Sequence, residues 1–204
     1  SVRHGIDIRD PLAGEYPWYV LMELSSSRDD ARAALESILA QGLDEGVVAD
    51  AVIAANLTQR RAFWKLRDEM SAAQKPEGLS WKHDVSVPVS KVAELIERAG
   101  TEIGRRWPGV RIAAFGHVGD GNIHYNISEP QGGDPAFEAG REACARLVHD
   151  LVNELGGSIS AEHGLGVMKS EEALRYKSLA EVATMRAVRQ ALDPKRIMNP
   201  RVLF

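Results

Sequence analysis

The chain has 204 residues, of which 44% are hydrophobic and 26% charged, and its formal net charge is −4. This length is sufficient for a substantial buried core, in one large domain or two small ones. An acidic balance with no run of Lys or Arg argues against a general nucleic-acid-binding protein, and no apolar run approaches the roughly 18 residues that a membrane span requires. Cys144 is the single cysteine, so an internal disulfide is excluded. Since no secretory leader pattern is present either, the expected location is the cytoplasm.

The N-terminal part of the chain predicts a linker, two strands and two helices. Residues 1–17 are polar and rich in turn formers, so they are interpreted as a linker that leads into a domain over residues 18–204. Strands are favoured where apolar and β-branched residues cluster, and helices where apolar residues recur at helical spacing behind a capping residue. The predicted elements are a strand over 18–25, a helix from Ser26 or Ser27 to about Gln41, a strand over 47–55 and a helix over 57–74.

The C-terminal part predicts a hairpin surrounded by helices. In chain order the pattern predicts a strand over 81–89, a helix over 91–107, a hairpin over 111–128, a helix from 134 to about 155, a short strand over 158–164 and a helix over 170–192. Strands and helices alternate, but one pair of strands is joined by a tight turn. The expected fold class is therefore α+β, with a mixed or antiparallel sheet covered by helices.

Two histidines flank the turn of the predicted hairpin in the stretch FGHVGDGNIHYNIS. An Asp-Gly pair between strand-like flanks favours a two-residue type I′ turn, here at Asp120 and Gly121. That register places His117 opposite His124, with Cβ atoms about 4.5–5.5 Å apart, close enough for both imidazoles to bind one metal ion. Asn126 is expected on the same face as His124. The alternative is a solvated cross-strand pair, or a histidine bonded to a backbone carbonyl.

The stretch ISAEHGLG supplies two further candidate groups, Glu162 and His163, at the end of a predicted strand. Two histidines and one glutamate form a known catalytic zinc ligand set that leaves a position open for substrate. The alternative for Glu162 is a helix cap or a salt bridge. The alternative for His163 is a buried ring bonded to a carbonyl.

Basic residues near the predicted core indicate a site for an anion. Arg67 borders the apolar stripe of its predicted helix, and Ser71 follows it by four residues on the same face. Lys82 opens the next predicted strand. An inward-facing Arg needs an anionic partner, and it fits a carboxylate with two parallel hydrogen bonds. The alternative is an internal ion pair, for example between Arg67 and Asp84.

Three segments together make the chain similar to one family: FGHVGDGNIHYNIS, GSISAEHGLGVMKS and ALDPKRIMNP. They resemble the C-terminal substrate domain of FAD-linked 2-hydroxy acid dehydrogenases, a family that includes D-lactate dehydrogenases, D-2-hydroxyglutarate dehydrogenases and the glycolate oxidase flavoprotein subunit. The resemblance covers nearly the whole chain and implies a ferredoxin-like substrate domain. It also implies an N-terminal domain, absent from this chain, that binds the FAD.

The chain itself has no nucleotide-binding motif, as expected if the N-terminal domain binds the FAD. Neither GHVGDG nor GLGVMK has the order of a dinucleotide loop or a P-loop. The terminus reads NPRVLF where the family usually has NPGKVL or similar, so no cofactor-binding residue is assigned here. The chain is expected to be the C-terminal part of a longer protein, or one subunit of a split one, and to be inactive without the flavin domain.

The resemblance implies a role for each matching residue. Those that match the family's ligands for a divalent metal, zinc in the first place with manganese or iron as options, are His117, His124 and Glu162. Those that match its substrate-binding residues are Arg67, Ser71, Lys82, Asn126 and His163, where Ser71 stands at a position often occupied by threonine. In the family, the residue that matches His163 also acts as the catalytic base.

The predicted function is metal-assisted oxidation of a small D-2-hydroxy acid to the 2-oxo acid, with hydride transfer to FAD. The metal would lower the pKa of the substrate hydroxyl, and His163 would remove its proton. Two alternatives remain, a metal-dependent hydrolase and a non-catalytic metal-binding module. The sequence names neither the particular hydroxy acid nor the electron acceptor, and a homodimer is one option for the assembly.

Overall fold

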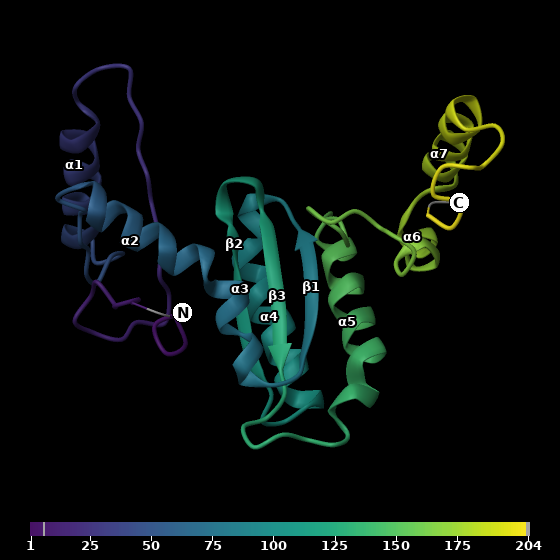
Figure 1. Ribbon diagram of the computed structural model, residues 1–204, viewed down its shortest axis with the longest axis horizontal. Helices are drawn as coiled ribbons and strands as arrows, with labels where there is room; N and C mark the ends of the chain where they lie inside the picture. The colour runs from purple at the N-terminus through teal and green to yellow at the C-terminus, as the bar shows by residue number, and fades with distance from the viewer. Residues whose placement is uncertain (6, 203–204) are drawn as a thin grey trace. The chain divides into compact units, whose positions relative to one another are not determined.

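The computed structural model describes residues 1–5 and 7–202 (Figure 1). Leu203 and Phe204, the end of the NPRVLF terminus, lie outside the described residues. The chain divides into two compact units, Ser1–Glu77 and Gly78–Phe204, and each is described by itself. The predicted boundary between a linker over 1–17 and a domain over 18–204 stays a prediction.

The first unit contains helices and extended chain. Its helices are α1 (Ala31–Asp44), α2 (Leu57–Asp68) and α3 (Met70–Ala73), followed by a short 3-10 helix, η1 (Lys75–Glu77). The Asn56 side chain caps α2 by accepting a hydrogen bond from the backbone N–H of Gln59. The single helix predicted over 57–74 is interrupted at Glu69, which separates α2 from α3.

The two strands predicted in this unit are wrong. Residues 18–25 and 47–55 form no strand, although both segments carry the expected apolar residues. A strand requires a partner for its backbone hydrogen bonds and a buried face for its side chains. In the described residues neither segment belongs to a ladder, and Val20 and Val47 are 79% and 77% exposed.

The second unit is built on a three-stranded antiparallel sheet of order β1-β3-β2 (Figure 1). Its strands are β1 (Ser80–Ser86), β2 (Arg111–His117) and β3 (Asn122–Ser128). Its helices are α4 (Val92–Arg106), α5 (Arg141–Glu154), α6 (Ser170–Tyr176) and α7 (Leu179–Leu192), with short 3-10 helices η2 (Val89–Lys91), η3 (Val118–Asp120) and η4 (Phe137–Gly140). The predicted α+β class with an antiparallel sheet is confirmed.

Alternation along the strands gives the sheet one apolar and one polar face. The core side chains of the sheet are Trp81, Val85, Ile123, Tyr125 and Ile127, and they pack with apolar residues of α4 and α5. Figure 1 shows α4 behind the sheet and α5 alongside β1. Because side chains alternate between faces, the residues between these core positions lie on the opposite, polar face. That face carries Lys82, Asp84, Asn122, His124 and Asn126.

The predicted register of the hairpin is wrong by two residues. His117 pairs with Asn122, and His124 pairs with Phe115. The reason is the turn: η3 and Gly121 form a four-residue connection in which Gly121 has φ +72°, in place of the two-residue type I′ turn. Since the side-chain period of a strand is two, a shift of two residues leaves both histidines on the same face, as diagonal rather than direct neighbours.

Three other predicted boundaries differ from the structure. The strand over 158–164 is reduced to a single bridge between Ser158 and Ser86. The helix predicted from residue 134 begins as an α-helix only at Arg141, after η4. The helix predicted over 170–192 is divided, because Ser178 caps α7 through a reciprocal capping box with Glu181.

Gly121 is required by the backbone of the hairpin turn. Its φ is positive, and a Cβ atom added to it would collide with the carbonyl oxygen of Val87. We expect Gly121→Ala to lower the free energy of unfolding by more than about 2 kcal/mol, since strain and overlap with backbone act together. The matched control is Gly119→Ala in the same turn, where an added Cβ meets no atom within 4 Å. Equal urea midpoints for the two variants would contradict this account of the turn.

His83 lies on the core face of β1, and its burial makes the fold sensitive to acid. Nδ1 lies 2.8 Å from the carbonyl oxygen of Tyr125, and burial lowers the pKa of His83 from 6.5 to about 4. Between these values the unfolded chain binds more protons than the folded chain, so the free energy of unfolding decreases as the pH falls. We expect a decrease on the order of 2 kcal/mol from His83 between pH 7 and pH 5.

The measurement is urea unfolding at pH 7 and pH 5 for the wild type and His83→Gln. The variant has no imidazole at this position, so its loss of stability on acidification should be smaller. An identical loss in both proteins would show that His83 does not titrate between those pH values on unfolding.

Candidate functional site

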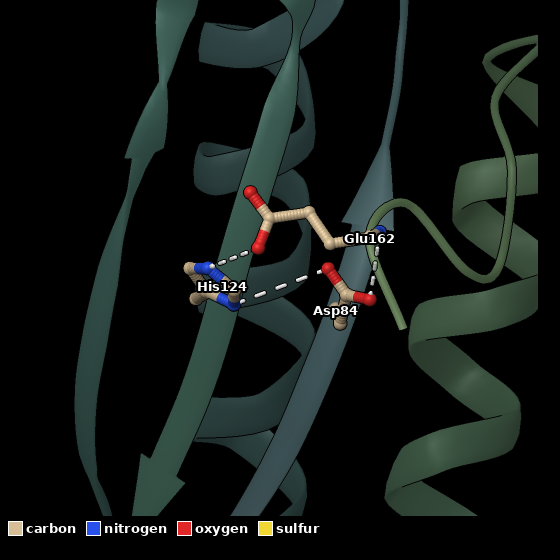
Figure 2. Close-up of side chains that lie close together, drawn as sticks. All are labelled: Asp84, His124 and Glu162. Atoms are coloured by element: carbon tan, nitrogen blue, oxygen red, sulfur yellow. Dashed lines mark hydrogen bonds and ion pairs between the residues drawn. The ribbon is translucent and has the colours of Figure 1, made fainter. Parts of the chain in front are cut away.

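Three side chains from separate parts of the second unit converge on the polar face of the sheet (Figure 2). Asp84 comes from β1, His124 from the neighbouring β3, and Glu162 from the loop that follows the Ser86–Ser158 bridge. Nε2 of His124 lies 3.6 Å from Oε2 of Glu162, and Nδ1 lies 4.0 Å from Oδ1 of Asp84. One imidazole is thus placed between two carboxylates.

His117 extends this cluster along the polar face. Its Nδ1 lies 3.6 Å from Oε1 of Glu162, and the same oxygen accepts a hydrogen bond from Nδ2 of Asn122 at 2.5 Å. The predicted ligand residues His117, His124 and Glu162 therefore lie close together, even though the two histidines are not directly paired across the strands.

The loop that carries Glu162 is fastened to β1 by its backbone. Ser86 and Ser158 exchange two backbone hydrogen bonds, of 3.0 and 2.8 Å. Further along, Oδ2 of Asp84 accepts hydrogen bonds from the backbone N–H groups of Glu162 and His163, at 3.0 and 2.9 Å. A loop held at these points presents Glu162 to the face of the sheet.

Asp84 is ionised at neutral pH although it is buried. Burial raises the pKa of Asp84, whereas the backbone hydrogen bonds from His163 and Glu162, together with the charges of His163 and His124, lower it. The net result is a pKa below the usual value for this carboxyl group. The site therefore contains a buried negative charge.

The donor set fits a divalent cation. Ligand atoms of Asp84, His124 and Glu162 all lie within 4.8 Å of one another. Among the described residues, Oδ1 of Asp84 is buried without a hydrogen-bond partner, and it faces His124. An ionised carboxylate oxygen in that state requires a cation or a donor. Imidazole nitrogens and carboxylate oxygens are the ligands that Zn²⁺ and related metals take in catalytic sites.

Asp84 is the residue that sequence reasoning missed. The sequence suggested Asp84 only as an ion-pair partner for Arg67. In the structure, the Arg67 side chain contacts Asp68. The alternation of WKHDVSV does place Asp84 on the same face as Lys82, which was the available signal. Its contacts with residues 162 and 163 depend on a loop far away in the sequence, so no local pattern could have shown them.

The predicted substrate-binding residues fall into two groups, because three of them belong to the second unit and two to the first. Lys82 and Asn126 are register partners on β1 and β3, beside His124 on the polar face. The His163 side chain is 70% exposed, and its ring centroid lies 6.0 Å from that of His124. Arg67 and Ser71 lie on α2 and α3 of the first unit, and their role stays a prediction.

Comparison with known proteins places this chain in a family. The model of the family described as "FAD linked oxidases, C-terminal domain" matches residues 2–203. The chain belongs to this family, so the resemblance found in the sequence is confirmed.

The relatives carry the names of dehydrogenases of 2-hydroxy acids. The chain is 34% identical to a D-2-hydroxyglutarate dehydrogenase of Arabidopsis thaliana, over 98% of the chain and 34% of the relative. It is 33% identical to a D-2-hydroxyglutarate dehydrogenase of Stutzerimonas stutzeri, over 97% of the chain and 43% of the relative. A Schizosaccharomyces pombe protein with a D-lactate dehydrogenase name is 30% identical, over 93% of the chain and 37% of the relative. The chain thus spans about a third to two fifths of the length of these relatives.

The predicted cytoplasmic location is contradicted by the relatives' names. The similar proteins of Arabidopsis thaliana, Danio rerio and Rattus norvegicus are all named mitochondrial. Within the described ranges, no helix combines the length and the apolar character that crossing a bilayer would take.

Proposed function

We propose that this chain is the substrate- and metal-binding part of an FAD-dependent dehydrogenase that oxidises a D-2-hydroxy acid to the corresponding 2-oxo acid. The observation that carries the proposal is the convergence of Asp84, His124 and Glu162 on one face of the sheet, with His163 beside them. Membership of the family supports the flavin. The FAD would be bound by an N-terminal domain outside this chain.

The metal would be held by His117, His124 and Glu162. Oδ1 of Asp84, which has no hydrogen-bond partner among the described residues, faces Nδ1 of His124. Zinc is the first candidate, and manganese and iron are the alternatives. When bound, such a metal polarises the hydroxyl and carboxylate oxygens of a substrate and lowers the pKa of the hydroxyl.

The chain's own residues would bind the acid and move its proton. Lys82 and Asn126 can bind the carboxylate from the polar face. His163 accepts the hydroxyl proton as general base. The electron pair of the Cα–H bond leaves as hydride, for which FAD supplies the acceptor, so that one proton and one hydride are removed for each 2-oxo acid formed.

D-2-hydroxyglutarate is the first substrate to test, because the relatives with up to 34% identity carry that name. The assay uses the protein together with its flavin domain and follows reduction of an electron-accepting dye with D- and L-2-hydroxyglutarate, D-lactate and glycolate. We expect turnover with at least one D-acid and none with L-2-hydroxyglutarate. Absence of turnover with all of them would contradict the proposal.

Experiments on the chain alone distinguish the other two functions that the sequence leaves open. Hydrolysis of a nitrophenyl ester by the chain alone, without flavin, would indicate a metal-dependent hydrolase. Full folding without metal affinity or turnover would indicate a non-catalytic module. Light scattering on the same sample tests the homodimer.

A further inference from the structure

The two carboxylate oxygens of Asp84 make different contacts. Oδ1 faces Nδ1 of His124 at 4.0 Å and has no hydrogen-bond partner within the described chain. Oδ2 accepts the backbone N–H groups of Glu162 and His163, at 3.0 and 2.9 Å, and also lies 3.0 Å from Nδ1 of the His163 ring. A single buried carboxylate therefore contacts the backbone and the side chain of the same histidine.

The short distance between Oδ2 and the ring restricts the imidazole. A bare Nδ1 lone pair at 3.0 Å from an anionic oxygen would be repelled, whereas an Nδ1–H group at that distance is attracted. A neutral imidazole carries its proton on one nitrogen only, so a proton on Nδ1 leaves Nε2 as the acceptor.

We propose that Asp84 is a positioning residue for His163: it holds the histidine's backbone and keeps the neutral ring in the tautomer with hydrogen on Nδ1, so that Nε2 is free to accept the substrate proton. The inference rests on the proposed function, in which His163 is the general base. The arrangement resembles in its logic the carboxylate that orients the histidine of a serine-protease triad.

The exposure of the two side chains explains why such a residue is needed. The His163 side chain is 70% exposed, whereas that of Asp84 is only 6% exposed. An exposed ring on a loop has little packing to fix its orientation, and an imidazole free in water populates both tautomers. Asp84 belongs to β1, which pairs with β3 over its whole length, so it can transmit the rigidity of the sheet to the ring.

The first test needs no variant. The ¹⁵N chemical shifts of the His163 ring, recorded on the labelled 204-residue chain at a pH where the ring is neutral, report its tautomer, and both partners lie in the unit Gly78–Phe204. His163→Ala identifies the signal by its disappearance. We expect the Nδ1–H tautomer to predominate. A ring with hydrogen predominantly on Nε2 would overturn the proposal.

The second test compares Asp84→Asn with Asp193→Asn. Asp193 is the matched control, because it is also buried and also accepts two backbone N–H groups, those of Ile197 and Met198, at 3.0 and 2.9 Å. In the protein joined to its flavin domain and saturated with Zn²⁺, we expect Asp84→Asn to lower kcat by about 100-fold or more, with KM changed by less than about threefold. Asp193→Asn should leave kcat within about twofold of wild type. Equal kcat values for the two variants would overturn the proposal.

The third test asks whether Asp84 acts through His163. Two groups that act as a unit give non-additive losses, so adding Asp84→Asn to His163→Ala should lower kcat no further. A full additional loss in the double variant would mean that Asp84 acts by another route, such as the metal, and would overturn the proposal. If Asp84→Asn does not fold, the tautomer of the wild-type ring still decides the question.

These outcomes also separate the inference from the function on which it rests. A lowered kcat in His163→Ala together with a normal kcat in Asp84→Asn would exclude only the positioning role of Asp84. A normal kcat in His163→Ala would exclude His163 as the general base, and the proposed mechanism with it.

Discussion

Replacing His163 by alanine, in the protein joined to its flavin domain, should lower kcat by about 10²–10⁴-fold and leave KM nearly unchanged. The proton of the substrate hydroxyl has to leave before or together with the hydride, and His163 is the group proposed to accept it. Alanine keeps the backbone N–H that Oδ2 of Asp84 binds, so the loop keeps that anchor. Because the ring is 70% exposed, little packing is lost with it.

Steady-state kinetics at saturating D-2-hydroxy acid measure this loss, and the pH dependence of kcat provides a second readout. The control is His4→Ala, which removes an imidazole that contacts Glu77 in the first unit. A kcat for His163→Ala within threefold of the wild type would exclude His163 as the general base.

The second large effect is expected in metal binding. His117→Ala/His124→Ala removes both imidazoles next to Glu162 and should weaken binding of Zn²⁺ or Mn²⁺ by about 100-fold or more, because two of the proposed ligands are lost. Both side chains lie on the polar face of the sheet, away from the core residues, so the fold should persist.

Calorimetric titration and metal analysis of the chain measure this effect, again with His4→Ala as control. The wild type is expected to bind close to one metal ion per chain. The same affinity in the wild type and the double variant would show that the ion binds elsewhere, and an absence of binding in the wild type would contradict the metal site as described.

The general architecture of the second unit could be predicted from sequence because apolar and polar residues alternate along β1 and β3. WKHDVSV and NIHYNIS each place large apolar residues on one face and polar residues on the other, which is sufficient to predict a half-buried sheet. The register could not be predicted, because Asp-Gly favours a two-residue turn by local preference, whereas the observed turn also contains η3. Local preference does not include the contact between Gly121 and Val87 that fixes this turn.

The site could be predicted in part. His117, His124 and Glu162 were found because imidazole and carboxylate groups cluster in two short motifs, and a register error of two residues does not change the face of a strand. Asp84 was missed because its partners are backbone groups of residues 162 and 163, which no periodicity reveals. The strands predicted over 18–25 and 47–55 failed because apolar composition alone does not supply a hydrogen-bonding partner.

The most direct test of the proposed function is the anaerobic reduction of FAD by D-2-hydroxyglutarate in a stopped-flow spectrophotometer. The protein with its flavin domain is compared as isolated, after removal of metal by a chelator, and after addition of Zn²⁺ or Mn²⁺. The account predicts rapid bleaching of the flavin by the D-acid, loss of this reaction in the metal-free protein and its return with metal. Flavin reduction at an undiminished rate without metal, or no reduction by any D-2-hydroxy acid, would contradict it.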